Sequence, residues 1–358
     1  MEAVYNDWHW QFANRIEGLK QLGEYIDLDD DLVKGIEGAS KLFRWSVTPY
    51  YASLMKRDDP DCPIRKQALP SIVELEDAEG ETDPLDEEKH SPVEGLIHNY
   101  PDRVAFVITG ECAMFCRHCT RRRKVGKVDT HLSRSALACG INYIKEHPEI
   151  RDVLLTGGDP LVASDEWLEW IISNIRAIEH VQIIRIGTRV PCTMPQRITD
   201  ELCQMLSKYH PIWLNTQFNH PRELTEEAAK ACDKLLRAGV PVGNQSVLLK
   251  GINDSSEVMR ELVHGIVKMR VRPYYLYQCE VIRGTRHFRT PMEVGIDIIK
   301  HLQGYTTGFA VPTFVLDTPI GKIPVSPQNV VDRDSEYVTL RNYEGKIFKL
   351  RNPKDGWE

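Results

Sequence analysis

The sequence has 358 residues, of which 42% are apolar and 27% charged, an ordinary balance for a globular domain with extensions. Its net charge of −7 argues against nucleic-acid binding, which usually needs a basic face. It lacks an apolar run of the roughly 20 residues that span a bilayer, and it begins without the apolar core of a signal peptide. We therefore predict a cytoplasmic protein that binds neither nucleic acid nor membrane.

The nine cysteines fall into two groups. Six are scattered singly along the chain: Cys62, Cys139, Cys192, Cys203, Cys232 and Cys279. The other three lie together between Cys112 and Cys119. A secreted disulfide framework would instead be dense and paired in a shorter chain. The contrast indicates one thiolate-rich site in a reducing compartment.

Residues 1–100 lack a regular alternation of strands and helices, and we interpret them as an N-terminal helical extension. Helices are predicted near residues 7–24 and 30–43. The segment 74–88 that follows is strongly acidic. Because a run of like charges is usually solvated, we expect a solvent-exposed loop there.

From Arg103 onward, short β-branched segments alternate with amphipathic ones. The predicted strands cover residues 103–109, 152–158, 183–189, 212–218, 242–249 and 272–278. The predicted helices cover residues 134–147, 165–177, 199–208, 225–238, 255–269 and 292–302. Strands that are apolar on both faces and are each followed by a helix indicate a parallel sheet.

The fold class predicted from this alternation is α/β. Six strand–helix units are two short of a complete eight-unit barrel, so we predict that residues 101–305 form an open, partial (β/α) barrel of six units. A doubly wound sheet is the alternative. Residues 306–358 would then form a C-terminal segment.

Polar or unusual residues follow five of the predicted strands at the same point. They are Cys112–Cys119, Gly157–Asp159, Arg189, Asn244–Gln245 and Cys279–Glu280. The carboxyl ends of parallel strands meet at one edge of the sheet, where proteins of this class build their sites. We expect these residues to converge there.

Cys112, Cys116 and Cys119 have the spacing C-x3-C-x2-C. Three thiolates on one loop can bind three corners of a [4Fe–4S] cluster and leave one iron open to a small molecule. The alternatives are structural zinc, which normally needs a closed set of four ligands, and inert thiols. His118 lies inside the loop, but beside Cys119 it is expected to point away from the other ligands.

The same spacing after the first strand of a βα series is the hallmark of the radical S-adenosylmethionine (AdoMet) superfamily. Several longer segments resemble lysine 2,3-aminomutase and its relatives. They are WSVTPYYASL (45–54), DDPDCPIRKQALPS (58–71), FCRHCTRRR (115–123), LLTGGDPL (154–161), LNTQFNHPRELT (214–225), GNQSVLLKGIND (243–254), RPYYLYQCE (272–280) and HFRTP (287–291). The resemblance covers about residues 5–350.

The resemblance implies three cofactors: a [4Fe–4S] cluster on the three cysteines, AdoMet and pyridoxal 5′-phosphate. Gly157, Gly158 and Asp159 match the element that holds the methionyl amine of AdoMet, and Gln245 matches a residue near the cofactors. Lys322 matches the lysine that carries pyridoxal phosphate, in a loop two residues shorter than the family's. Arg103 matches a phosphate-binding arginine.

The family moves an α-amino group from C2 to C3, so the resemblance predicts an isomerase. Arg121 matches the arginine that binds the substrate carboxylate, whereas Arg122 and Arg123 are expected to be structural or surface charges. Asp317 matches one of two aspartates that hold the distal ammonium of lysine, and Glu280 stands in place of the other.

Two carboxylates predict a basic L-amino acid as the substrate. We favour L-lysine, with arginine or ornithine as alternatives. Arg283 and Arg286 lie near Glu280 in sequence and could neutralise it. A radical-AdoMet enzyme that modifies a lysine of a partner protein, and a non-enzymatic iron–sulfur or zinc protein, are the competing classes.

The expected partners are the amino acid and an electron donor such as flavodoxin or ferredoxin. Long-form lysine enzymes have a C-terminal cysteine tail that binds zinc, and this chain lacks it. Ser255 stands at the place of the family's remaining zinc ligand. We therefore expect no zinc. If the chain forms a homo-oligomer, zinc would not stabilise it as in the long-form enzymes. Gln217 stands where the family has histidine.

Overall fold

A single nine-stranded sheet with its strands in chain order forms the centre of this computed structural model, which describes residues 2–126, 130–326, 328–342 and 344–351. Its strands are β1 (Leu96–Tyr100), β2 (Arg103–Thr109), β3 (Asp152–Gly157), β4 (Ile183–Gly187), β5 (Ile212–Thr216), β6 (Val242–Leu248), β7 (Arg272–Gln278), β8 (Thr313–Thr318) and β9 (Gly321–Pro324). Strands β2 to β8 are parallel, whereas β1 and β9 pair antiparallel at the two edges.

The strand order confirms the partial barrel and excludes the doubly wound alternative, which requires the order to reverse within the sheet. Each of the six predicted strands is present, and each ends within two residues of its predicted last residue. The helices between them are α7 (Arg134–Glu146), α8 (Asp165–Arg176), α9 (Val190–Thr193), α10 (Asp200–Ser207), α11 (Glu226–Arg237), α12 (Ser256–Lys268) and α13 (Met292–Leu302). Among the described residues, none of the helices has the length and apolarity needed to cross a membrane.

Helix α11 illustrates why the local sequence folds as it does. The Thr225 hydroxyl accepts a hydrogen bond from the Ala228 amide and so satisfies one of the free donors of the first turn. Gly239, just after the helix, has a φ of +79°, a conformation that glycine adopts without strain. Between these signals, Ala231 and Leu235 are buried on the face that packs on the sheet.

Strands β1, β8 and β9 are not among the predicted strands, and they bring the edges of the sheet close together. The Tyr100 hydroxyl of β1 accepts a hydrogen bond from the Lys322 amide of β9 at 2.9 Å. The Asn99 side chain donates to the Pro319 carbonyl at 3.3 Å. These two contacts nearly close the barrel, and they place the β8–β9 hairpin beside the first strands.

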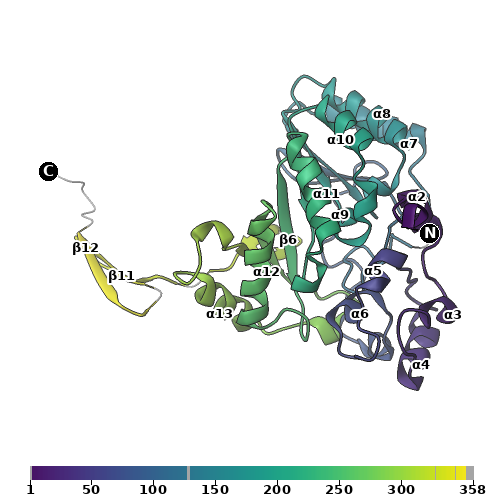
Figure 1. Cartoon of the computed structure of the whole chain (residues 1–358). Helices are drawn as coiled ribbons and strands as arrows, with labels where there is room; N and C mark the ends of the chain where they lie inside the picture. The colour runs from purple at the N-terminus through teal and green to yellow at the C-terminus, as the bar shows by residue number, and fades with distance from the viewer. Residues whose placement is uncertain (1, 127–129, 327, 343, 352–358) are drawn as a thin grey trace.

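The N-terminal helices cover one side of the barrel (Figure 1). They are α1 (Glu2–Tyr5), α2 (Trp8–Ala13), α3 (Leu19–Leu22), α4 (Asp30–Ala39), α5 (Pro49–Ser53) and α6 (Pro63–Ala68). The single helix predicted over residues 7–24 is wrong, because Ile16 forms a β-bridge with Val47 and the chain is extended at Gly18. Helix α4 also ends earlier than residue 43. One hydrophobic core runs from these helices into the barrel.

A separate sheet of three antiparallel strands follows the barrel: β10 (Val330–Arg333), β11 (Tyr337–Arg341) and β12 (Ile347–Arg351). Figure 1 shows β11 and β12 (yellow) projecting away from the body of the molecule. Several of its large apolar side chains are exposed to solvent: Val330, Val331, Ile347, Phe348 and Leu350. This sheet therefore has an apolar surface that the rest of the described chain does not cover.

Candidate active site

A cavity of about 310 Å³ opens at the carboxyl ends of the parallel strands. Its lining includes all of the predicted site residues except Arg103: Cys112, Cys116, Cys119, Arg121, Gly157, Gly158, Asp159, Gln245, Glu280, Asp317 and Lys322. Arg189 also lines it, as expected from its place after β4, whereas Asn244 and Cys279 do not. The cavity has the volume of an ordinary small-molecule site.

The loop that carries the cysteines is held in place by the N-terminal segment. The Phe115 amide donates to the Ser46 carbonyl at 3.2 Å, and the Arg117 amide donates to the Gln67 carbonyl at 2.9 Å. Both acceptors lie in the region that covers the barrel. The three cysteines are thus positioned by two layers of structure, the end of β2 and the N-terminal helices.

The chemistry of the three thiols fits an iron–sulfur cluster. Burial raises the pKa of Cys112 well above its usual value, and the neighbouring Cys119 adds to the effect. Burial and Cys116 together raise the pKa of Cys119 to about 11. Near neutral pH such thiols stay protonated until a cationic centre binds them and displaces the proton. Among the described residues the cavity lining holds no fourth cysteine, which suits a cluster with one open iron.

Two glycines let the end of β3 pack directly on the cysteine loop. The Gly158 amide donates to the Thr109 carbonyl at 2.7 Å, and the Asp159 amide donates to the Glu111 carbonyl at 2.6 Å. A Cβ on Gly157 would collide with the Thr109 carbonyl, and one on Gly158 with the Glu111 carbonyl. These two glycines therefore allow the end of β3 to pack closely on the cysteine loop.

The Asp159 carboxylate is buried and braces the end of β4. One oxygen accepts from the Thr188 hydroxyl at 2.6 Å and from the Leu161 amide at 3.1 Å. The other accepts from the Arg189 amide at 2.7 Å. Burial raises the pKa of Asp159, and these hydrogen bonds oppose the shift. Its predicted contact with the amine of AdoMet stays a prediction.

Arg121 lies on the cavity wall with part of its guanidinium fixed. Its Nε donates to the Glu87 carboxylate at 2.8 Å, and one terminal nitrogen donates to the Thr156 hydroxyl at 3.0 Å. The Glu87 side chain is buried and also pairs with Lys124 at 3.3 Å. These contacts orient the arginine at the cavity.

The predicted solvent-exposed acidic loop is only partly correct, because three buried carboxylates of segment 74–88 are counter-ions of arginines: Glu74, Asp77 and Glu87. The side chains of Glu76, Glu79, Glu81 and Glu88 are exposed, as predicted. The Glu74 side chain is fully buried and pairs with Arg117 at 2.6 Å and with Arg122 at 2.8 Å. Asp83 pairs with Arg123 at 2.7 Å. A buried guanidinium is costly unless a carboxylate neutralises it, so this segment folds inward. Arg122 and Arg123 are structural charges, as expected.

Asp77, in the same segment, fixes the chain that follows Glu280. One oxygen of its carboxylate accepts from the amides of Gly284, Thr285 and Arg286. The same oxygen pairs with Arg289 at 2.6 Å. The acidic segment therefore connects the cysteine loop to the loop after β7.

Asp317 and Lys322 are cross-strand neighbours in the β8–β9 hairpin, and their side chains form an ion pair of 2.6 Å. The Lys322 ammonium also lies 5.5 Å from the centre of the Tyr277 ring. Burial and the Asp317 charge raise the pKa of Glu280 to about 8, although Lys322 and Arg121 oppose the shift. One Glu280 oxygen is buried without a hydrogen-bond partner.

Arg283 and Arg286, whose guanidinium groups could neutralise Glu280, are not among the charged groups with the largest effect on the Glu280 pKa. Their backbones make other contacts. The Arg283 carbonyl accepts from Arg122, and the Arg286 amide donates to Asp77. The cations that act most strongly on Glu280 are Lys322 and Arg121. At neutral pH Glu280 is therefore mostly protonated, and a further cation near it would favour its ionised form.

Arg103 lies at the start of β2, outside the cavity lining. Its guanidinium stacks 3.7 Å from the centre of the Tyr100 ring and pairs with Asp102 at 2.8 Å. The Tyr100 hydroxyl in turn accepts from the Lys322 amide. One aromatic ring thus separates Arg103 from the predicted cofactor lysine.

Two family models match the chain. One describes the radical SAM superfamily and matches residues 106–263, and the other describes lysine-2,3-aminomutase and matches residues 299–358. The chain is 53% identical to L-lysine 2,3-aminomutase of Fusobacterium nucleatum over 99% of its own length and 84% of the relative's. It is 52% identical to the enzyme of that name from Clostridium subterminale, covering 98% of this chain and 85% of the relative. The chain belongs to the lysine 2,3-aminomutase family.

The family membership predicted from the sequence is therefore confirmed. The predicted enzyme class is also confirmed, since the family consists of isomerases. The superfamily implies a [4Fe–4S] cluster and AdoMet, and the aminomutases use pyridoxal phosphate, which is the cofactor set predicted above. A glutamate 2,3-aminomutase from Clostridioides difficile is 46% identical over 98% of this chain and 84% of the relative. Membership of the family thus leaves more than one amino acid as the substrate.

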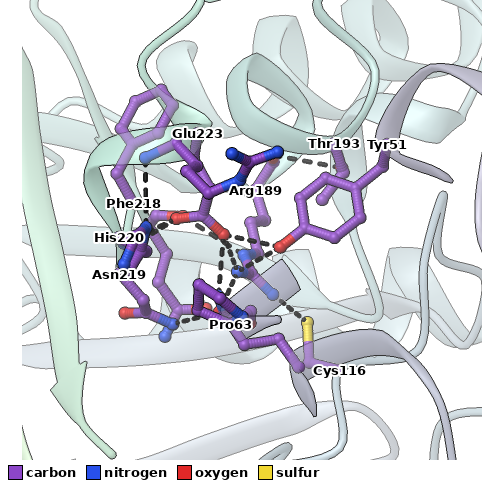
Figure 2. A network of polar contacts seen from close by, with 12 residues as sticks. Tyr51, Pro63, Cys116, Arg189, Thr193, Phe218, Asn219, His220 and Glu223 are labelled. Carbon is purple, nitrogen blue, oxygen red and sulfur yellow. Dashed lines mark hydrogen bonds and ion pairs between the residues drawn. The ribbon is translucent and has the colours of Figure 1, made fainter. Parts of the chain in front are cut away.

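An ion pair that the sequence did not predict lies beside Cys116 of the cysteine loop. Arg189 donates to the Cys116 sulfur at 2.9 Å and pairs with Glu223 at 2.9 Å (Figure 2). The position of Arg189 after β4 was a signal, and Glu223 lies in segment 214–225, which resembles the family. Neither pattern indicates that the two side chains pair. Their pairing joins residues 34 positions apart and is visible only in the fold.

Proposed function

We propose that the chain is a radical-AdoMet, pyridoxal-phosphate-dependent 2,3-aminomutase that converts L-lysine to L-β-lysine. The observation that carries the proposal is the ion pair between Asp317 and the Lys322 ammonium, beside the partly unpaired Glu280. The Lys322 ammonium is the same chemical group as the distal end of a lysine substrate. When Lys322 bonds to the cofactor, its ammonium no longer pairs with Asp317, and a cationic substrate end would replace it beside Asp317 and Glu280.

Arg121 is proposed to bind the carboxylate of the amino acid, because a planar guanidinium can do so with two parallel hydrogen bonds. Glu87 and Thr156 hold the guanidinium from one side and leave the remaining donors for the substrate. An arginine and two carboxylates on the wall of one cavity match the carboxylate and the distal ammonium of a basic α-amino acid in charge.

The site residues fit the cofactors of the family. Cys112, Cys116 and Cys119 would hold the cluster, and Gly157, Gly158, Asp159 and Gln245 would lie along AdoMet. Lys322 would carry pyridoxal phosphate, with Arg103 on the phosphate side. When bound, these groups supply the radical that removes a substrate hydrogen and the carbonyl carbon that takes up the migrating nitrogen. The protein's part is to orient the amino acid and to exclude water from the cavity.

The cavity of about 310 Å³ supports a small-molecule substrate over a lysine on a partner protein. Arginine and ornithine satisfy the same charge pattern and stay as alternatives to lysine. We also propose a cytoplasmic protein that receives electrons from a flavodoxin or ferredoxin. The exposed apolar side chains of β10–β12 support a homo-oligomer.

Binding of L-lysine to the holoenzyme at pH 7 is expected to release a proton from Glu280. Its pKa is about 8 while the Lys322 ammonium lies nearby, and loss of that ammonium to the cofactor would raise the pKa further, so the empty site holds Glu280 mostly protonated at this pH. A cation at the carboxylate pair lowers that pKa, so about one proton leaves per site, and affinity rises with pH through neutrality. Calorimetry in two buffers of different ionisation enthalpy measures the released proton.

The Glu280→Gln variant is the matched control, because it keeps the shape of the side chain and cannot titrate. It should lose this proton release, whereas protons from the reacting α-amine are unchanged. Asp317→Ala should weaken lysine binding by about 2–5 kcal/mol, since it leaves the bound cation poorly paired. Equal proton release in the wild type and in Glu280→Gln would contradict the proposed substrate pocket.

A further inference from the structure

Arg189, directly after β4, presents all three guanidinium nitrogens to fixed acceptors. Nε donates to the Gln217 carbonyl at 3.2 Å, and one terminal nitrogen donates to the Cys116 sulfur at 2.9 Å. The other terminal nitrogen donates to the Gln67 side chain at 2.6 Å and to Glu223 at 2.9 Å. The guanidinium is therefore held rigidly with one donor on a cysteine of the iron–sulfur motif.

Glu223 is equally fixed. Its side chain is 0% exposed, and that of Arg189 is 7% exposed. The Tyr51 hydroxyl donates to one Glu223 oxygen at 2.6 Å, and the amides of Asn219 and His220 donate to the other (Figure 2). Since neither partner can move into solvent, both charges of this ion pair act permanently on the sulfur beside them.

The backbone of Arg189 is tied to the same site. Its amide donates to the Asp159 carboxylate, and its carbonyl accepts from the Thr193 hydroxyl at 3.1 Å. A purely structural arginine would need only carbonyl or carboxylate partners, as Arg197 has in Leu161, Ala163 and Asp165. The contact with a thiol is what distinguishes Arg189.

A hydrogen bond to a ligating sulfur and a nearby positive charge both favour the state of an iron–sulfur cluster that carries one more electron. We propose that Arg189 sets the reduction potential of the cluster through Cys116, and that Glu223 positions Arg189 and partly offsets its charge. Both are positioning residues, since they act through a cluster ligand. The inference rests on the proposed function only in that Cys116 binds the cluster.

The test is an anaerobic redox titration of the reconstituted protein without AdoMet, followed by the electron paramagnetic resonance signal of the reduced cluster. Arg189→Gln should lower the midpoint potential, because it removes a positive charge beside the sulfur. Glu223→Gln should raise it, because it removes a negative charge. We expect the ratio of reduced to oxidised cluster to change at least tenfold at a given potential in each variant, which corresponds to about 59 mV.

Arg189→Lys keeps the charge and should lie between the wild type and Arg189→Gln. Arg197→Gln is the matched control, a buried arginine bonded to no cluster ligand, and should keep the wild-type potential. Opposite shifts in Arg189→Gln and Glu223→Gln cannot come from loosening of the site, which would act in one direction. Unchanged potentials, or shifts of the same sign, would overturn the inference.

If Arg189→Gln fails to hold a cluster, Glu223→Gln decides the question alone: a raised potential supports the inference, and an unchanged or lowered one overturns it. Wild-type protein that holds no cluster would contradict the proposed function itself before any variant is compared. The two failures are thus distinguishable by iron content.

Discussion

Replacing any one of Cys112, Cys116 and Cys119 by alanine is expected to abolish reductive cleavage of AdoMet. Each thiolate is proposed to bind a different iron, so the loss of one leaves a second iron open and the cluster unstable. The rest of the fold should survive, because the loop is also held by backbone hydrogen bonds to Ser46 and Gln67. Iron content and the formation of 5′-deoxyadenosine measure the effect.

Cys139→Ala is the control for this prediction. Cys139 is exposed on α7 and lies outside the cavity lining, so its replacement should leave iron content and cleavage unchanged. Full iron content together with AdoMet cleavage in any of the three loop variants would remove that cysteine from the ligand set.

The Lys322→Ala variant is expected to lose all aminomutase activity, because it removes the amine that is proposed to hold pyridoxal phosphate covalently. Borohydride reduction of the wild-type holoenzyme, followed by peptide mapping, should place the pyridoxyl group on Lys322. The cross-strand register of Lys322 with Asp317 places Lys322 on the cavity wall.

Lys250 provides the comparison, since it is an exposed lysine outside the cavity lining. Lys250→Ala should keep both the label and the activity. A pyridoxyl group found on Lys250, or retained by the Lys322→Ala variant in the same yield, would show that another lysine carries the cofactor.

The barrel strands and helices could be predicted because each is a local pattern: a short apolar strand, a capped helix and a polar turn. Strands β1, β8 and β9 could not, because their pattern is incomplete. In β1 only the first two residues, Leu96 and Ile97, are buried, and in β8 only Phe314 and Val315 are. Their pairing depends on neighbours already in the sheet.

The acidic segment shows a different limit of sequence analysis. A run of carboxylates is expected to be solvated unless its counter-ions are known. The counter-ion of Glu74 is Arg117, which lies 43 residues further along the chain. Glu223 and Arg189 pose the same problem, because each is an ordinary charged residue until the barrel brings them together. The residues on the cavity wall were predictable from motif, whereas the charges that position them were not.

The most direct test of the proposed function is a product assay with the anaerobically reconstituted enzyme, AdoMet, pyridoxal phosphate and a reductant. L-Lysine, L-arginine, L-ornithine, L-glutamate and L-alanine are supplied separately, and the β-amino acid formed from each is quantified. The charge pattern of Arg121, Glu280 and Asp317 predicts β-lysine from L-lysine and no product from L-glutamate or L-alanine. Robust formation of β-glutamate or β-alanine, with none from the three basic amino acids, would contradict it.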